Sequence, residues 1–184
     1  MGEAINLIDN FKVDNVIFNC GSYNELEQGL IAVLNRKKIP YYSCISELNI
    51  DNVKLYFLNT KDYNDENENS SVIYSEINNT KILFMGDAGI EKEKDILEKY
   101  NLKDIDILKV GHHGSNTSTS KEFISSIKPK QCLISVGKNN RYGHPKESVI
   151  DILDDACNIY RTDLNASVEI KLKNNDYKIK TISP

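Results

Sequence analysis

From Asp87 onward the sequence alternates regularly between amphipathic helices and short apolar strands. The predicted helices lie near residues 91–100, 120–127 and 145–156. Each is followed by an apolar strand, and these strands lie at residues 105–110, 132–136 and 159–160. Strands separated by short amphipathic helices form a sheet that is covered by helices. The alternation therefore predicts an α/β fold, with Pro145 at the first position of the last of these helices.

The first half of the chain adds helices, strands and one polar loop. Ser22 and Glu25 form a Ser-x-x-Glu pattern that predicts the start of a helix ending before Pro40. Strands are expected at residues 53–58, 71–77 and 81–84. The acidic loop at residues 61–69 has no residue expected in the core and is the one candidate linker. Because a hairpin follows it directly, we expect an excursion within a single domain of residues 1–184.

Composition excludes several classes of protein. The longest apolar clusters are far shorter than the roughly 20 residues that span a bilayer, so no membrane contact is expected from this chain itself. The four cysteines are far apart in sequence and form no Cys-x-x-Cys pair. Since three of them lie in apolar, strand-like surroundings, we expect buried free thiols.

Charge is unevenly distributed along the chain. The net charge of −4 disfavours indiscriminate binding of nucleic acid. Residues 109–146 nevertheless carry seven basic side chains and only one acidic one, Glu122. This basic stretch could attract a phosphate backbone, or it could be a set of solvated lysines at helix ends and turns.

Three loops place metal-ligand residues directly after apolar strands. Asp87 follows the first of these strands, the pair His112 and His113 follows the second, and a longer loop after the third ends in His144. Each loop alone is commonly a plain turn, but the carboxyl ends of strands in an α/β sheet are where ligands usually bind. Carboxylate and imidazole groups suit zinc or manganese. Together the loops predict one shared site.

Five stretches of the sequence resemble motifs of a known family. Residues 82–88 resemble the aspartate-bearing strand of the metallo-β-lactamase fold. The others are similar to motifs of the ComEC-type branch of DNA-uptake competence proteins, and they lie at residues 69–73, 104–118, 138–145 and 159–163. The likeness covers nearly all of residues 1–183.

The resemblance implies a four-layer αββα sandwich and metal-dependent hydrolysis of a DNA phosphodiester. It implies two zinc or manganese ions bridged by Asp87, with one of His112 and His113 completing a coordination shell; His112, which continues the strand directly, is the preferred of the two, although sequence parity does not decide between them. His144 would be a further ligand or a proton donor to the leaving oxygen. Phosphate contacts are expected from two further residues, Ser115 and Arg141. Members of the family also carry a separate membrane-spanning part.

The chain departs from the family in one respect. The signature His-x-His-x-Asp-His is absent, since no histidine precedes His112. The resemblance places this signature immediately before Met1, so we expect a truncated domain that lacks part of one sheet. Such a chain should bind metal weakly or not at all and hydrolyse DNA close to background. The alternatives are a metal-free nucleic-acid-binding module, or a hydrolase of a small phosphodiester or an amide.

Overall fold

A computed structural model describes residues 3–174 and 176–182, which fall into two compact units that divide between Ile45 and Ser46. The polar loop considered as a linker lies inside the second unit. The single-domain assignment stays a prediction. Residues 1–5 resemble the stretch that follows the family signature, and of these Met1 and Gly2 lie outside the described residues. In the described part of the chain, no helix is long and apolar enough to cross a membrane.

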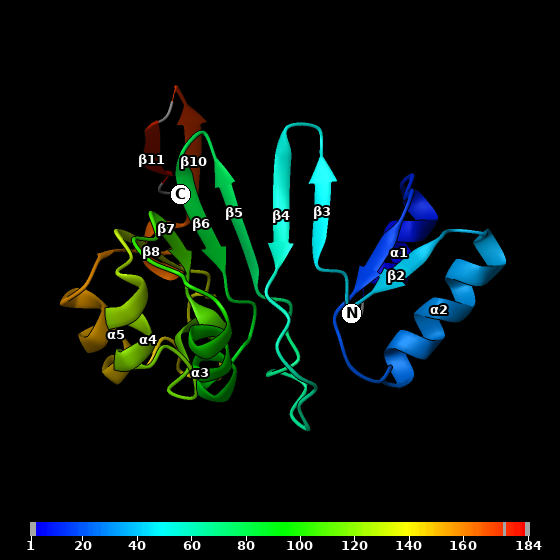
Figure 1. The fold of residues 1–184 in the computed structure, drawn as a ribbon, viewed down its shortest axis with the longest axis horizontal. Coiled ribbons are helices and arrows are strands. Elements are labelled where there is room, and N and C mark those ends of the chain that lie inside the picture. The colour runs from blue at the N-terminus through cyan, green and yellow to red at the C-terminus, as the bar shows by residue number, and fades with distance from the viewer. Residues whose placement is uncertain (1–2, 175, 183–184) are drawn as a thin grey trace. The chain divides into compact units, whose positions relative to one another are not determined.

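The first unit contains both helices and strands and has its own hydrophobic core (Figure 1). In chain order it contains α1 (Ala4–Asn10), β1 (Val16–Phe18), α2 (Glu25–Lys37) and β2 (Tyr41–Ser43). The two strands pair in parallel, and α2 connects them. Its buried core is apolar and consists of Ile8, Phe18, Leu30, Val33 and Leu34.

The N-terminus of α2 lies two residues later than the capping pattern predicted. Asn24, not Ser22, is the N-cap, and its side chain accepts a hydrogen bond from the backbone N–H of Glu27 at 3.0 Å. The Glu27 carboxylate accepts the backbone N–H of Asn24 at 2.8 Å, which completes a capping box. The predicted capping box of Ser22 and Glu25 was therefore wrong, because Asn24 and Glu27, two residues further on, form the capping box instead.

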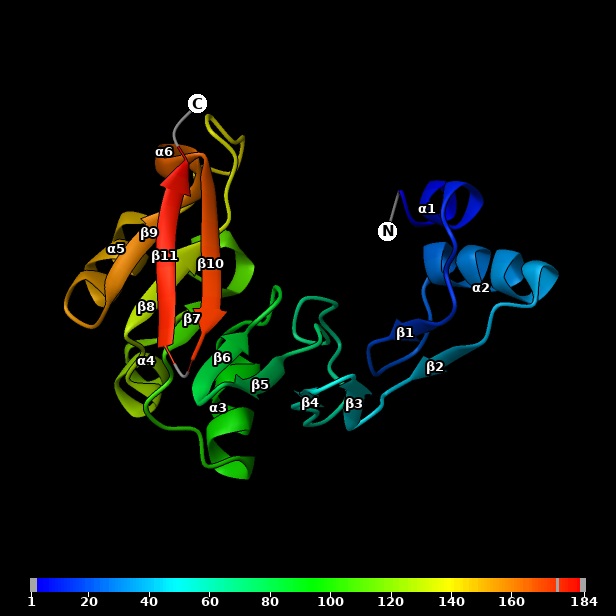
Figure 2. The same ribbon diagram turned by 90° about the horizontal axis from the view of Figure 1, so that it is seen from above.

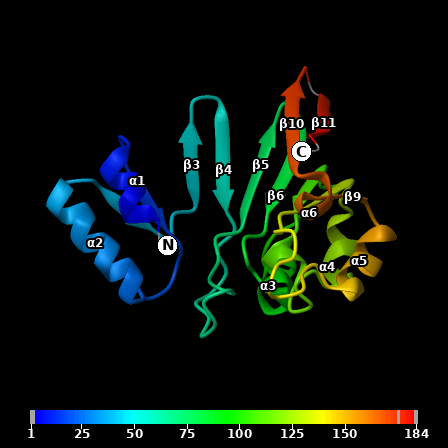
Figure 3. The same ribbon diagram turned by 180° about the vertical axis from the view of Figure 1, so that it is seen from behind.

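The second unit contains a seven-stranded sheet in the order β3-β4-β5-β6-β7-β8-β9. Strands β3 to β6 are antiparallel (Figure 3), and strands β6 to β9 are parallel. Their bounds are Glu47–Ile50, Val53–Phe57, Ile73–Ile77, Thr80–Phe84, Ile107–Lys109, Gln131–Ile134 and Asn158–Arg161. A separate hairpin pairs β10 (Ser167–Lys173) with β11 (Asp176–Ile182). The predicted α/β class is confirmed.

Three helices connect the parallel strands. They are α3 (Ile90–Lys99), α4 (Lys121–Ile127) and α5 (Glu147–Asp154), and two short turns, η1 (Gly111–Gly114) and α6 (Thr162–Asn165), follow β7 and β9. Pro145 lies two residues before α5, so its predicted position inside the first turn was wrong. Lys146 is the N-cap of this helix, with an extended backbone.

The two faces of the large sheet are covered differently. Leu83, Leu108 and Cys132 are neighbours across β6, β7 and β8, and they pack into a core with the three helices. One residue earlier, Gln131 points to the opposite face and donates a hydrogen bond to the Tyr177 hydroxyl of β11 at 3.2 Å. The hairpin therefore covers the face opposite the helices, as Figure 2 shows. The apolar side chain of Phe84 lies on this face and remains 43% exposed.

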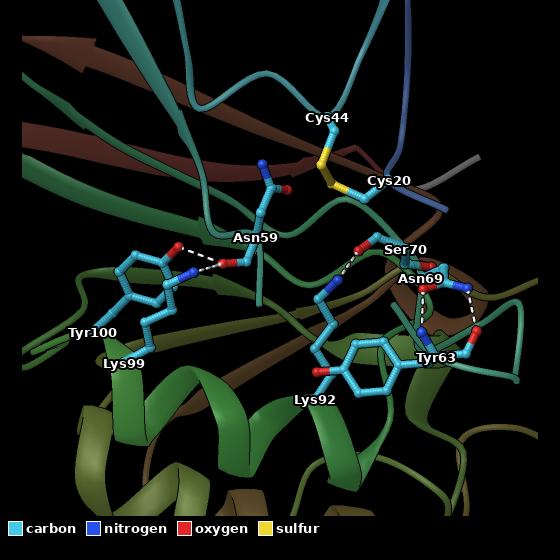
Figure 4. Close-up of a disulfide and its surroundings, with 9 residues drawn as sticks. All are labelled: Cys20, Cys44, Asn59, Tyr63, Asn69, Ser70, Lys92, Lys99 and Tyr100. Carbon is cyan, nitrogen blue, oxygen red and sulfur yellow. Dashed lines mark hydrogen bonds between the residues drawn. A yellow bond between two sulfur atoms is a disulfide. The ribbon is translucent and has the colours of Figure 1, made fainter. Parts of the chain in front are cut away.

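All four cysteines form disulfides. Cys20 and Cys44 follow the paired strands β1 and β2, and their sulfurs are bonded (Figure 4). Cys132 in β8 is bonded to Cys157, which immediately precedes the neighbouring strand β9. The prediction of buried free thiols was wrong, because strand pairing brings together cysteines that are 24 and 25 residues apart in sequence.

Candidate active site

Parallel pairing of β6, β7 and β8 brings the three ligand-bearing loops to one edge of the sheet. Asp87 follows β6, His112 and His113 lie in the turn after β7, and His144 ends the loop after β8. His113 Nε2 lies 3.5 Å from Asp87 Oδ1, and these side chains are 48% and 44% exposed. The His112 and His144 rings lie edge to face, with centroids 5.9 Å apart.

The orientation of His113 distinguishes it from its neighbour. Its Nδ1–H donates to the backbone carbonyl of Ser135 at 2.6 Å. In the neutral ring, Nε2 then carries a lone pair that faces the Asp87 carboxylate. Metal-ligating histidines commonly donate their other ring N–H to a carbonyl in this way. His112 instead has Nδ1 at 3.3 Å from the Thr117 hydroxyl, so His113 is the ring better placed to share a cation with Asp87.

His144 has an unusual electrostatic environment. Its Nδ1 is buried and has no hydrogen-bond partner within the described residues. Burial lowers the pKa of His144, and the charges of Lys146, His112 and His113 lower it further. A lowered pKa favours the neutral imidazole, which can bind a metal or accept a proton.

The turn after β7 has a constrained backbone. His112 and His113 have φ values of 44° and 56°, in the left-handed region that side chains with a Cβ rarely occupy. A hydrogen bond from the His112 N–H to the Gly86 carbonyl at 3.0 Å ties this turn to the loop that carries Asp87. A Cβ at Gly111 would lie 2.9 Å from the Ala88 carbonyl oxygen, so glycine is needed for this close approach. Such constrained backbones are concentrated at functional sites.

The N-terminus of α3 fixes the segment that precedes the hairpin. The Glu68 carboxylate accepts the backbone N–H groups of Gly89 at 3.1 Å and Lys92 at 3.0 Å. Lys92 Nζ donates to the Ser70 carbonyl at 2.8 Å (Figure 4). The Ser70 hydroxyl in turn accepts the backbone N–H of Asp87 at 3.1 Å. Lys92 is 4% exposed, and burial lowers its pKa to about 8. This chain of contacts holds Asp87 in place.

A second buried side chain, that of Glu93, fixes the loop that follows the histidine turn. Glu93 is 1% exposed, and its carboxylate accepts the backbone N–H groups of Thr119 and Ser120. Burial raises the pKa of Glu93. The hydroxyl of Ser118 donates to the Gly111 carbonyl at 3.0 Å, at the start of the histidine turn. Helix α3 therefore supports both the Asp87 loop and the histidine loop.

The two predicted phosphate-contact residues, Ser115 and Arg141, differ in their exposure to solvent. Ser115 is 5% exposed, and its hydroxyl is 3.0 Å from that of Thr117. Arg141 is exposed, and its guanidinium carbon lies 4.8 Å from the centre of the Tyr142 ring.

Three further residues contact the site but were not singled out from the sequence. Lys109 ends β7; burial lowers its pKa, while the nearby Asp87 charge opposes that shift. Ser70 bonds the backbone of Asp87. Tyr142 stacks on His144 with ring centroids 5.8 Å apart. The signal in the sequence was that Ser70, Lys109 and Tyr142 each lie within a stretch that resembles a family motif.

The donor set suits a cation only in part. Among residues 3–174 and 176–182, no group of three or more His, Cys, Asp or Glu side chains lies close enough together to hold a metal ion. The chemistry of the individual donors fits zinc or manganese, since Asp87 and His113 offer facing lone pairs and His144 has an unpaired buried nitrogen. These residues therefore fit part of a metal site.

Comparisons with known proteins identify relatives but no matching family model. The chain is 31% identical over 180 residues to "ComE operon protein 3" of Bacillus subtilis, which covers 95% of the chain and 23% of that protein. It is 33% identical to "Competence protein ComA" of Neisseria gonorrhoeae, over 59% of the chain and 16% of that protein. It is 38% identical to "Recombination protein 2" of Haemophilus influenzae, over 48% of the chain and 11% of that protein. The chain spans less than a quarter of the length of each of these relatives. On these similarities it belongs to the ComEC-type family of competence proteins.

Proposed function

We propose that this chain forms part of a metal-dependent DNA phosphodiesterase of the metallo-β-lactamase type that acts in DNA uptake. The observation that carries the proposal is the distance of 3.5 Å between His113 Nε2 and Asp87 Oδ1 at the carboxyl edge of a parallel sheet, where a neutral His113 ring and the carboxylate present facing lone pairs. A cation between two acceptors removes their repulsion, and a His-x-His-x-Asp-His segment would supply the ligands still needed. The names of the relatives support competence and DNA as the setting.

Each residue of the site has a specific role in this proposal. A pair of bound metal ions would activate water and neutralise charge on the phosphate. Asp87 would hold metal through its carboxylate, and the Ser135 carbonyl orients His113 so that Nε2 faces that carboxylate. The lowered pKa of His144 favours a neutral ring that can act as a ligand or move a proton at the leaving oxygen. Lys109 places a positive charge beside Asp87.

The uncovered part of the large sheet supports the proposed sandwich. Leu55, Phe57 and Ile73 share the hairpin side of the sheet with Phe84 and are only partly buried. An apolar sheet face of this kind is normally covered by another layer. A second sheet of the αββα sandwich would cover it.

A metal-free nucleic-acid-binding module is the second candidate. Of the basic stretch, Lys138, Arg141 and Lys146 lie in or beside the loop that ends in His144. Lys130, in contrast, pairs with Asp106 at 2.7 Å next to the opposite end of β8. The basic residues near the site therefore suit a phosphate backbone with or without a metal.

Titration with Mn²⁺ of a protein that carries a His-x-His-x-Asp-His segment ahead of residue 1, followed by proton NMR of the rings of His112, His113 and His144, separates the two candidates. Because Mn²⁺ is paramagnetic, we expect the His113 ring signal to broaden first, and the His112 and His144 signals to follow. Asp87→Asn should weaken the effect several-fold, whereas Asp155→Asn, an exposed position after α5, should leave it unchanged. Equal broadening in wild type and Asp87→Asn, or none in either, contradicts metal binding at Asp87 and favours the metal-free module.

A further inference from the structure

An exposed aromatic side chain lies directly against the candidate active site. Tyr142 is 60% exposed, and its ring is nearly parallel to that of His144, with an interplanar angle of 15° and centroids 5.8 Å apart. The guanidinium carbon of Arg141 lies 4.8 Å from the Tyr142 ring centre. An imidazole, a phenol and a guanidinium therefore cluster beside His112, whose ring centroid lies 5.9 Å from that of His144, and Tyr142 and Arg141 are exposed.

The loop that carries Tyr142 is braced by its own hydrogen bonds. Asn140 Oδ1 accepts the backbone N–H of His144 at 3.0 Å, and Asn140 Nδ2 donates to the His144 carbonyl at 2.7 Å. Lys146 Nζ donates to the Tyr142 carbonyl at 2.9 Å. A ligand that contacts Tyr142 therefore meets a loop that is already ordered, which reduces the entropy cost of binding.

Tyr142 contributes little to the packing of the fold. It is absent from the buried cores of both units, and its exposed fraction is among the highest of the large hydrophobic side chains in the described chain. Burial therefore does not account for an aromatic residue here. Nucleobases stack on aromatic rings and on arginine planes, and a nearby positive charge attracts the phosphate that joins them.

We propose that Tyr142 and Arg141 form a nucleobase-binding subsite next to the candidate active site. A base stacks on the Tyr142–Arg141 surface, and the charges of Arg141 and Lys146 contact the adjoining phosphate. Stacking of Tyr142 on His144 places this phosphate toward the candidate active site. Base binding at this subsite does not depend on the proposed function. Only the reaction that the bound strand would undergo rests on it.

The test compares two fluorescently labelled oligonucleotides of equal length and charge, one of thymidines and one of abasic nucleotides. Binding to the full chain is measured by anisotropy in EDTA, so that hydrolysis and metal ions play no part. Wild type should bind the thymidine oligonucleotide about 5- to 150-fold more tightly than the abasic one, the range expected for one stacked base. Tyr142→Ala should remove this preference and leave abasic binding unchanged, and Tyr142→Phe should retain it.

The control is Tyr42→Ala, which removes a tyrosine of similar exposure (52%) from β2 in the first unit and should leave the preference intact. Equal affinity of wild type for both oligonucleotides, including failure to bind either, overturns the proposal. A thymidine preference that persists in Tyr142→Ala also overturns it. Absence of metal-dependent hydrolysis would instead contradict the proposed function and leave a base preference standing, so the two failures are distinguishable.

Discussion

Replacing Asp87 with alanine is expected to reduce metal-dependent DNA hydrolysis more than about a hundredfold in a protein that carries a His-x-His-x-Asp-His segment before residue 1. Loss of an outer-shell partner already lowers metal affinity or activity 10- to 100-fold, so loss of a shared ligand should have a larger effect. The carboxylate lies at the carboxyl edge of the sheet, 3.5 Å from His113 Nε2. Initial rates of oligonucleotide cleavage at saturating Mn²⁺ measure the loss.

The two adjacent histidines provide an internal comparison in the same assay. His113→Ala should lower the rate nearly as much as Asp87→Ala, because the Ser135 carbonyl orients its Nε2 toward the carboxylate. His112→Ala should have a smaller effect, since its Nδ1 lies beside the Thr117 hydroxyl. A protein with Asp87→Ala that keeps wild-type activity shows that this carboxylate is not a metal ligand.

Removing the disulfide between Cys132 and Cys157 is expected to lower the free energy of unfolding by at least about 3.5 kcal/mol. The bond closes a loop with a sequence separation of 25 residues, and closure of this length restricts the unfolded chain by about that amount. Cys132 is fully buried in the core beneath α4 and α5, so the double variant Cys132→Ala/Cys157→Ala also loses packing. Urea unfolding of the variant and of the wild type measures the difference.

The disulfide in the first unit provides a contrast. Cys44 is exposed, so the bond between Cys20 and Cys44 should react first when a phosphine reductant is added to the folded protein. The buried bond should react only as the second unit opens. Mass spectrometry after alkylation gives the order, and simultaneous reduction of both bonds, or an unchanged unfolding free energy in the double variant, contradicts this account.

Local periodicity was enough to predict most of the second unit. The helices α3 and α4 and the strands β5 to β9 each carry their own apolar pattern, which depends only on neighbouring residues. The short strands β2 and β3 were missed because Tyr41–Ser43 and Glu47–Ile50 are mostly exposed and lack that pattern. The disulfides were missed because their cysteines become neighbours only through strand pairing.

Part of the candidate site could also be predicted from the sequence. A loop that follows a parallel strand must emerge at the same edge as its neighbours, so the sequence alone grouped Asp87 with the histidines. The choice between His112 and His113 depends on the Ser135 carbonyl of another strand end, which no local pattern encodes. Lys92 and Glu93 look like solvated residues of a charged helix, and only tertiary packing shows that they are buried.

The most direct measurement is the rate of cleavage of a labelled oligonucleotide by two proteins, with Mn²⁺ and with EDTA. One protein is residues 1–184 alone, and the other carries a His-x-His-x-Asp-His segment ahead of residue 1. We expect cleavage by the extended protein in Mn²⁺, loss of cleavage in EDTA, and a rate close to background for residues 1–184. Cleavage that persists in EDTA, or robust metal-dependent cleavage by residues 1–184 alone, would contradict the proposed division of the metal site.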